Sequence, residues 1–181
     1  MKKVAIATAL GALLVGGMAN ADDGKGDKIR ARLVGFQEVP SVSTQGTATF
    51  DAVISPNGDA IDYEITYTGI QGTVTQSHMH VGQRSVIGGI VLWICGTPQI
   101  VSGSATTGGP AGTPTCTSPD GHFAGTWRPG DVQTLATQQI KTGELNEVIK
   151  AIHAGVAYVN VHSTITPSGE IRGQVRANRR D

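Results

Sequence analysis

The sequence predicts an all-β fold, an antiparallel Greek-key-like sandwich or barrel with one amphipathic helix near its C-terminal third. Three observations favour this class. Short segments rich in β-branched and aromatic residues recur along the chain. Turns rich in glycine and proline separate them, and the chain holds 25 Gly and 8 Pro. A single segment places its apolar side chains at helical spacing. This combination is typical of one antiparallel β domain.

The N-terminus has the pattern of a secretory signal peptide over residues 1–21. Lys2 and Lys3 precede an apolar segment over residues 4–18, and Ala19-Asn20-Ala21 is a small-residue cleavage pattern. The apolar part is shorter than the roughly 20 residues that a membrane-spanning helix needs, so we expect no transmembrane anchor. The protein is therefore expected to be exported, to the periplasm or the extracellular medium.

The rest of the chain is expected to form one domain. Residues 22–28 are polar and lack apolar anchors, which is typical of a flexible leader. Residues 29–177 have the length of a single domain, and residues 178–181 form a short, locally basic tail. The formal net charge of the whole chain is zero, so the composition gives no support for a nucleic-acid partner.

The first three expected strands lie in the N-terminal half. Residues 30–36 form the first, which stops at Val39-Pro40 because a proline disfavours regular structure before it. Residues 47–54 and 60–68 alternate apolar and polar side chains. The Ser-Pro-Asn-Gly-Asp segment at residues 55–59 has the residues of a tight turn, so the two runs are predicted to form a hairpin.

The second half supplies the remaining strands and the helix. Strands are expected at residues 74–81, 89–95, 122–127, 157–162 and 171–177, the last two forming a closing hairpin. The helix is expected over residues 143–154, with Thr142 as its N-cap and Gly155 at its end. Trp93 and Trp127 are expected in the core.

The two cysteines, Cys95 and Cys116, predict one disulfide bond. In an exported chain, pairing is the simplest use of two cysteines, and a pair of free thiols on a metal is the less favoured alternative. A bridge across a loop of this length stabilises a fold by roughly 3 kcal/mol.

A pair of histidines marks the candidate site. Alternate residues of a strand share a face, so His78 and His80 are expected to point the same way. The same alternation places His162 and Asn160 on a polar face of their strand. Three imidazoles suit copper or zinc, and we therefore predict a surface metal site. The alternative is that these histidines only bond to backbone groups at the junction of loops and strands.

Polar residues near the late strand are candidate outer partners of this site. Asn160, Glu170 and Arg172 are the candidates for orienting the histidines. Glu170 and Arg172 could also hold an anionic ligand or form a structural ion pair with each other, and the ion pair is favoured. His122 could be a fourth ligand, but a surface role is favoured because it has no same-face partner. His153 is expected in the last turn of the helix, without a chemical role.

Several short blocks of the sequence together form a recognisable pattern. They are Leu33-Val34-Gly35, Glu38-Val39-Pro40, residues 78–82, residues 88–91, Gly125-Thr126-Trp127, residues 158–163 and residues 169–174. These blocks resemble the CHRD domain family, extracellular modules first described in chordin. The resemblance implies a secreted β domain with no agreed catalytic activity.

A looser similarity concerns the copper ligands of copper-zinc superoxide dismutases, which also combine two alternate histidines with a histidine on a late strand. The clustered histidines of their zinc loop have no counterpart here. We therefore expect a non-catalytic binding module for an extracellular protein or small ligand, with no catalytic residue assigned. The alternative is a copper-dependent redox or dismutase-like metalloenzyme. Serine-hydrolase and paired-carboxylate patterns are missing from the sequence.

Overall fold

The computed structural model describes residues 26–98, 100–101, 104–105 and 108–177. The expected signal peptide and the tail at residues 178–181 lie outside the described residues, as does most of the expected leader. Among the residues described, no helix is long and apolar enough to cross a membrane.

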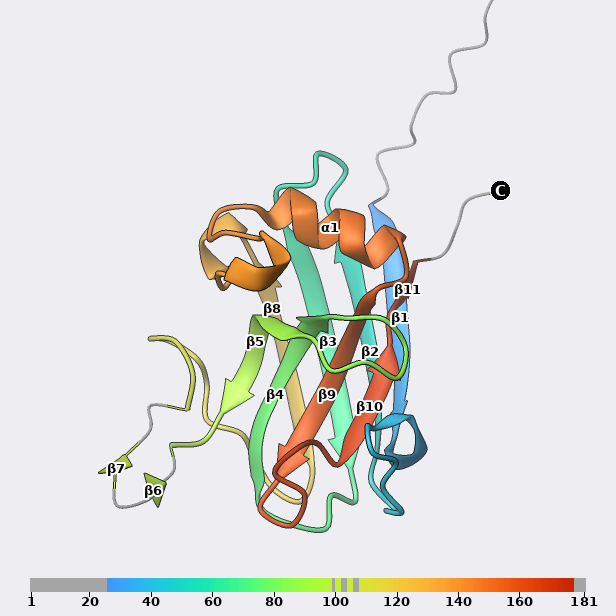
Figure 1. Cartoon of the computed structure of the whole chain (residues 1–181), viewed down its shortest axis with the longest axis vertical. Coiled ribbons are helices and arrows are strands. Elements are labelled where there is room, and N and C mark those ends of the chain that lie inside the picture. Colours follow the sequence, from blue (N-terminus) through green and yellow to red (C-terminus); the bar gives the residue numbers. More distant parts are fainter. Residues whose placement is uncertain (1–25, 99, 102–103, 106–107, 178–181) are drawn as a thin grey trace, which may run out of the picture.

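The main sheet is antiparallel and has nine strands (Figure 1). Their bounds are β1 (Asp27–Val34), β2 (Thr47–Ile54), β3 (Ile61–Thr68), β4 (Val74–Val81), β5 (Gly89–Gly96), β8 (Gly121–Trp127), β9 (Ala157–Ser163), β10 (Ile171–Gln174) and β11 (Arg176–Ala177). Strands pair in the order β5-β4-β9-β10-β1-β2-β3-β8, and β11 pairs with β1. A small separate hairpin joins β6 (Ile100–Val101) to β7 (Ser104–Ala105).

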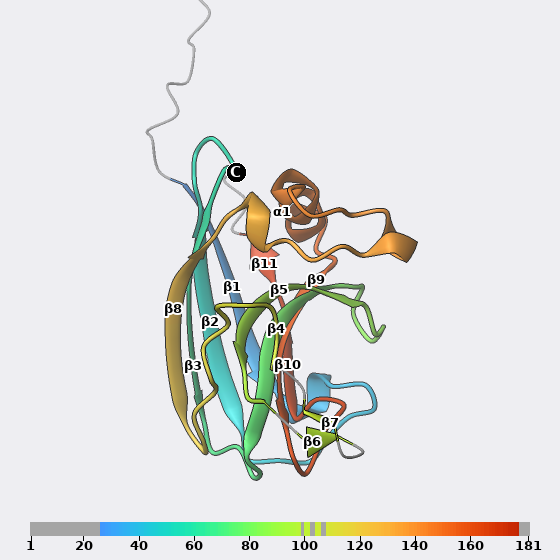
Figure 2. The same cartoon turned by 90° about the vertical axis from the view of Figure 1, so that its left-hand side faces the viewer.

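The sheet curls until its two ends, β5 and β8, approach each other and nearly close a barrel (Figure 2). The indole Nε1–H of Trp127 on β8 donates a hydrogen bond to the backbone oxygen of Trp93 on β5, at 2.8 Å. Closure of this kind covers the exposed edges that an open sheet presents. The all-β fold with one helix is therefore confirmed, as a nearly closed barrel.

The hydrophobic alternation read from the sequence decides which face of each strand points inward. On β1, Ile29, Ala31 and Leu33 are buried while the residues between them are exposed or partly exposed. The expected hairpin of β2 and β3 is confirmed by a continuous register from Thr47↔Thr68 to Ile54↔Ile61. β1 starts at Asp27, two residues before the expected start of the domain, because Asp27 and Lys28 pair with the end of β2.

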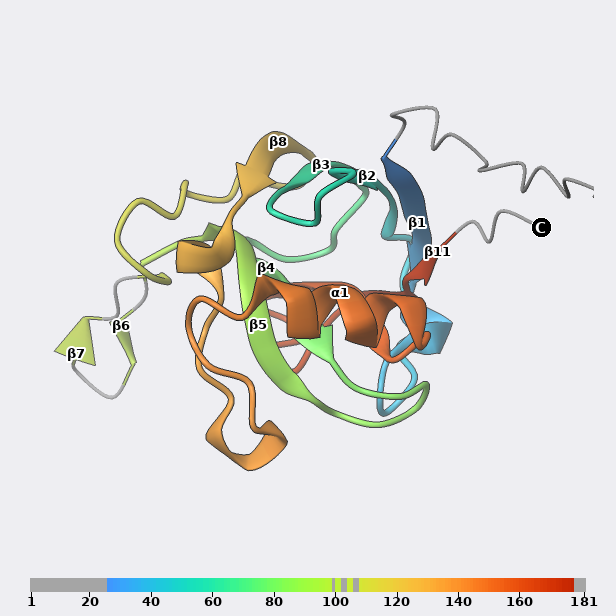
Figure 3. The ribbon, with the colours of Figure 1, turned by 90° about the horizontal axis from the view of Figure 1, so that it is seen from above.

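One α-helix, α1 (Leu145–His153), crosses one end of the barrel (Figures 1 and 3). It buries Leu145, Val148 and Ile152 against the core. Short 3-10 turns, η1 (Gly35–Gln37), η2 (Pro129–Asp131) and η3 (Ala136–Gln138), complete the elements of the described chain.

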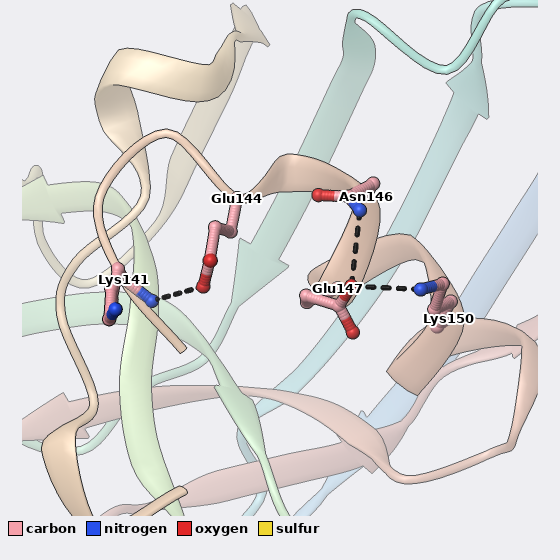
Figure 4. A network of polar contacts seen from close by, with 5 residues as sticks. All are labelled: Lys141, Glu144, Asn146, Glu147 and Lys150. Atoms are coloured by element: carbon pink, nitrogen blue, oxygen red, sulfur yellow. Dashed lines mark hydrogen bonds and ion pairs between the residues drawn. The ribbon is translucent and has the colours of Figure 1, made fainter. Parts of the chain in front are cut away.

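The start of the helix differs from the expected cap at Thr142. The N-cap residue is Glu144, whose carboxylate accepts a hydrogen bond from the backbone N–H of Lys141 at 2.7 Å. The hydroxyl of Thr142 instead lies 3.1 Å from that of Thr134. On the exposed side, Glu147 accepts hydrogen bonds from Asn146 and Lys150 (Figure 4). Such exposed pairs add only a few tenths of a kcal/mol to helix stability, about 0.2–0.5 each.

The expected disulfide joins Cys95 on β5 to Cys116, across a sequence separation of 21 residues. The double variant Cys95→Ala/Cys116→Ala is expected to lose about 3 kcal/mol of unfolding free energy, since the bridge restricts the unfolded chain. Urea denaturation of the variant, beside the wild type with and without a reductant, measures this loss. The reduced wild type should match the variant; a loss below about 1 kcal/mol would contradict the entropic argument.

Candidate metal centre

The three candidate histidines lie on two adjacent strands. His78 and His80 belong to β4 and His162 to β9, and these strands pair side by side in the sheet. Met79 on β4 and Val161 on β9 alternate with them and belong to the hydrophobic core. The histidines therefore lie on the opposite, outer face of the barrel wall.

The histidine side chains converge as the strand alternation predicts. One ring nitrogen from each of His78, His80 and His162 lies within 4.8 Å of the others. The ring centres of His78 and His80 are 4.6 Å apart, and those of His78 and His162 are 4.7 Å apart. We refer to these three residues as the histidine cluster.

The histidine cluster is buried, so the expectation of a surface site is wrong. His78 has no exposed area, and His80 and His162 are 6% and 8% exposed. Loops fold over this part of the outer face: Gly88, after β4, and Pro167, between β9 and β10, bring their carbonyl groups to His80 and His162. Strand alternation predicts which face a side chain takes, but it does not predict what covers that face.

Each imidazole directs one nitrogen to an oxygen. Nε2 of His78 lies 3.1 Å from Oε1 of Gln76. Nδ1 of His80 lies 2.9 Å from the carbonyl oxygen of Gly88, and Nδ1 of His162 lies 2.9 Å from that of Pro167. A carbonyl oxygen can only accept, so these ring nitrogens carry the hydrogen. This assignment, made from the hydrogen-bond network, leaves lone pairs on Nδ1 of His78, Nε2 of His80 and Nε2 of His162.

Two of these three lone-pair nitrogens have no hydrogen-bond partner. Nδ1 of His78 and Nε2 of His162 are both buried, and neither finds a partner within the described part of the chain. Burying a polar group without a partner costs free energy, about 1–3 kcal/mol per group. In a native structure, such a group often points to an ion or water that the site holds.

The third lone-pair nitrogen meets Asn160. Oδ1 of Asn160 lies 3.1 Å from Nε2 of His80, and its Nδ2 lies 3.4 Å from Oε1 of Glu38. With the hydrogen of His80 on Nδ1, this contact is favourable only when the amide turns its NH₂ group toward the ring. That turn directs Oδ1 at Glu38 and requires a protonated carboxyl there, and burial raises the pKa of Glu38. Asn160 thus takes the place expected for an outer partner of the cluster.

Burial keeps the cluster in the neutral form. Desolvation lowers the pKa of His80 to about 4, although the hydrogen bond to Gly88 opposes it. Desolvation also lowers the pKa of His162, and it lowers that of His78 well below the ordinary value, with the neighbouring His162 and His80 adding to the shift. Neutral imidazole is the form that binds metal ions, so protons compete little for this cluster at pH 7.

Aromatic rings enclose two of the three imidazoles. Tyr158 stacks on His80 with ring centres 4.5 Å apart and an angle of 6°. Trp93 meets His78 edge-on at 5.0 Å. Trp93 is only partly buried and contacts the cluster from β5, so its expected place in the core is wrong, whereas Trp127 is buried as expected.

The favoured ion pair between Glu170 and Arg172 does not form among the described contacts. Glu170 accepts hydrogen bonds from Thr44, Ser163, Thr166 and the backbone of Gln71. Burial would raise the pKa of Glu170, but these hydrogen bonds together lower it. Glu170 therefore joins loops by hydrogen bonds, and none of these hydrogen bonds is to a cluster histidine. Residues two apart share a face only within a strand, and Glu170 precedes β10, where the chain still bends.

Arg172 contacts the cluster only indirectly, through the ring of Tyr158. Its guanidinium lies 3.4 Å from the centre of the Tyr158 ring, and Tyr158 stacks on His80. Nη2 of Arg172 donates to the carbonyl oxygens of Gln83 and Val86. Of the expected outer partners, Asn160 therefore touches a histidine directly and Arg172 acts through Tyr158.

Sequence reasoning missed the residues that orient the imidazoles. Gln76 lies two residues before His78, and alternation could have identified it. The carbonyl groups of Gly88 and Pro167 carry no side-chain signal. Gly88 has a steric reason to be glycine, because a Cβ there would overlap the carbonyl oxygen of Val81.

The other two described histidines lie at the surface, as expected. His122 lies 3.1 Å from the hydroxyl of Thr66 and 3.7 Å from Glu64, and His153 lies 3.3 Å from Asp27. They are natural controls for the histidine cluster.

The family model described as "CHRD domain" matches residues 29–175, most of the chain. The chain belongs to the CHRD domain family. No curated protein and no solved structure matches it. The matched range of the CHRD domain contains all three cluster histidines and both cysteines, which are bonded to each other.

Proposed function

We propose that this CHRD domain is an exported, non-catalytic binding module whose histidine cluster holds one copper or zinc ion. The observation that carries the proposal is the pair of buried, unpartnered nitrogens, Nδ1 of His78 and Nε2 of His162. A bound cation would give both lone pairs a partner and remove the cost of leaving them unpaired. Export is supported by the pattern at residues 1–21 and by the disulfide, which suits an oxidising compartment.

The type of ligand atom in the histidine cluster suits copper and zinc. Among the described residues the cluster consists of three imidazoles, and nitrogen ligands suit copper and zinc, whereas magnesium and calcium prefer oxygen. Metal-bound imidazoles usually donate their second nitrogen to an oxygen, as Gln76, Gly88 and Pro167 allow here.

The spacing of the three ring nitrogens also suits one bound ion, after a small contraction of the cluster. With bonds of about 2.0–2.1 Å to nitrogen, three ligand atoms spaced evenly around one ion lie at most about 3.6 Å from one another. The span of 4.8 Å therefore requires each ring to move inward by less than about 1 Å. Three protein ligands leave a further coordination position for an exogenous ligand.

A copper-dependent redox enzyme is the second candidate. The observation that favours it is the contact of two oxidisable rings, Tyr158 and Trp93, with the ligand histidines. A binding module should show no turnover when fully loaded with copper, whereas a redox enzyme must cycle the metal between two oxidation states. Superoxide and ascorbate assays on copper-loaded protein distinguish the two.

Elemental analysis tests the metal site itself. Protein purified from an exported, oxidised source is loaded with copper or zinc, dialysed and analysed. We expect about one equivalent in the wild type and less than a tenth of that in His78→Ala/His80→Ala, because a single remaining imidazole binds weakly. The matched control His122→Ala/His153→Ala removes two surface histidines and should keep the full equivalent. Equal metal content in the two double variants, or an empty wild type, would refute the site.

A further inference from the structure

A cavity of 280 Å³ opens on the outer face of the barrel beside β10. One wall is the segment at residues 36–41, and the other is formed by Arg84 and Ser85 in the loop after β4. Arg172 and Gln174 of β10 complete the lining. Figure 1 shows the two loops approaching each other on this side of the molecule. The residues that line this cavity do not include a cluster histidine.

Arg172 is held in the cavity wall and has N–H donors that its contacts do not use. It is 2% exposed, lies over the Tyr158 ring and donates from Nη2 to two loop carbonyl groups. A guanidinium carries five N–H donors, so these two bonds leave others for a ligand. Because its rotamer is already fixed, a ligand would lose little free energy in ordering this side chain.

The loop that carries Arg84 is held in a strained form. Ser85 has a φ of 62°, in the left-handed region that a serine seldom adopts. The N–H of Val86 donates to the carbonyl oxygen of Gln83 at 3.1 Å, which closes a turn around Arg84 and Ser85. Backbone strain of this kind concentrates at ligand-binding sites.

The cavity has an excess of positive charge. Burial lowers the pKa of Arg172; Tyr158 and Glu38 oppose this shift, and the charge of Arg84 adds to it. Glu38 is the acidic residue of the lining, so one carboxyl faces two guanidinium groups. A bound anion would balance the remaining positive charge.

We infer that this cavity binds a small organic anion, a carboxylate held between Arg84 and Arg172 with its carbon skeleton against Phe36. Guanidinium groups bind carboxylates through paired, charge-assisted hydrogen bonds. Phe36 lines the cavity and is 74% exposed, so its ring offers an apolar surface to the carbon skeleton of such a ligand. The inference gives the proposed binding module a ligand class and does not depend on the metal.

Calorimetric titration of the exported, metal-free chain at low ionic strength tests the inference. The probes are benzoate, succinate and the uncharged benzamide. We expect benzoate or succinate to bind and benzamide to fail, and Arg84→Gln to weaken carboxylate binding at least tenfold. Arg84 is exposed, so this variant should fold. The control Arg30→Gln removes the same charge from an exposed position outside the cavity and should bind like the wild type.

The histidine variant separates this inference from the proposed metal site. His78→Ala/His80→Ala should still bind the carboxylate, even if it holds no metal. No binding of either carboxylate to the wild type, or equal affinities for the wild type and Arg84→Gln, would overturn the inference whatever the metal analysis shows.

Discussion

Zinc should stabilise the folded chain by about 4 kcal/mol when the free metal is held at a thousand times its dissociation constant. The reason is linkage: the three imidazoles are brought together only in the folded state, so the metal binds that state in preference. Urea denaturation at pH 7.5, with and without buffered zinc, measures the gain. Zinc is chosen because it has no redox chemistry of its own.

The two histidine variants serve as the controls for this gain. His122→Ala/His153→Ala should be stabilised as much as the wild type, since it keeps the histidine cluster. His78→Ala/His80→Ala should gain less than about 1 kcal/mol under the same conditions, since one cluster imidazole remains. A similar gain in both variants would mean that zinc stabilises the protein somewhere other than the cluster.

Acid should destabilise the metal-free protein well before its carboxylates titrate. In the unfolded chain a histidine takes up a proton near its ordinary pKa of about 6.5, whereas folded His80 does so near pH 4. Between these values the unfolded state binds more protons, so the free energy of unfolding falls as the pH falls. From pH 7.5 to pH 5.0, His80 alone contributes a loss of about 2 kcal/mol.

The other two cluster histidines should add to this loss of unfolding free energy, and the buried acid Glu38 should oppose it. The pKa of His78 and that of His162 are also lowered by burial, so both residues should add to the loss. Glu38 acts in the opposite sense, because burial raises its pKa and its protonated form is favoured in the folded state. Urea denaturation at several pH values checks the sum. A stability that stays constant between pH 7.5 and 5.0, or the same slope in His78→Ala/His80→Ala, would show that the cluster is not the cause.

Strand alternation predicted which side chains share a face, but not that their two strands are neighbours. His78 and His80 share a face because they are two residues apart, and His162 shares its face with Asn160 for the same reason. The pairing of β4 with β9 then joins the two sets, and the family resemblance already linked both blocks to one domain. The disulfide was predicted from the presence of two cysteines in a chain expected to be exported.

The sequence could not predict what covers the cluster. A strand pattern is local, whereas the loops over the outer face are placed by contacts between distant residues. Arg172 fixes the loop after β4 through Gln83 and Val86, nearly 90 residues away in sequence. Glu170 was paired with the wrong residue for the same reason: its partners Thr44 and Gln71 lie on other loops. Burial and hydrogen-bond partners therefore had to come from the structure.

The strand order also constrains how the protein is made. β9 lies between β4 and β10, and β10 lies between β9 and β1, so the last long strands of the chain occupy the middle of the sheet. Until the ribosome has released them, β4 and β1 have no partner on those sides, and the three imidazoles cannot meet. The barrel therefore cannot close until nearly the whole domain is available to fold. A chain truncated before β9 would lack strands from the middle of the sheet and not only from its edge.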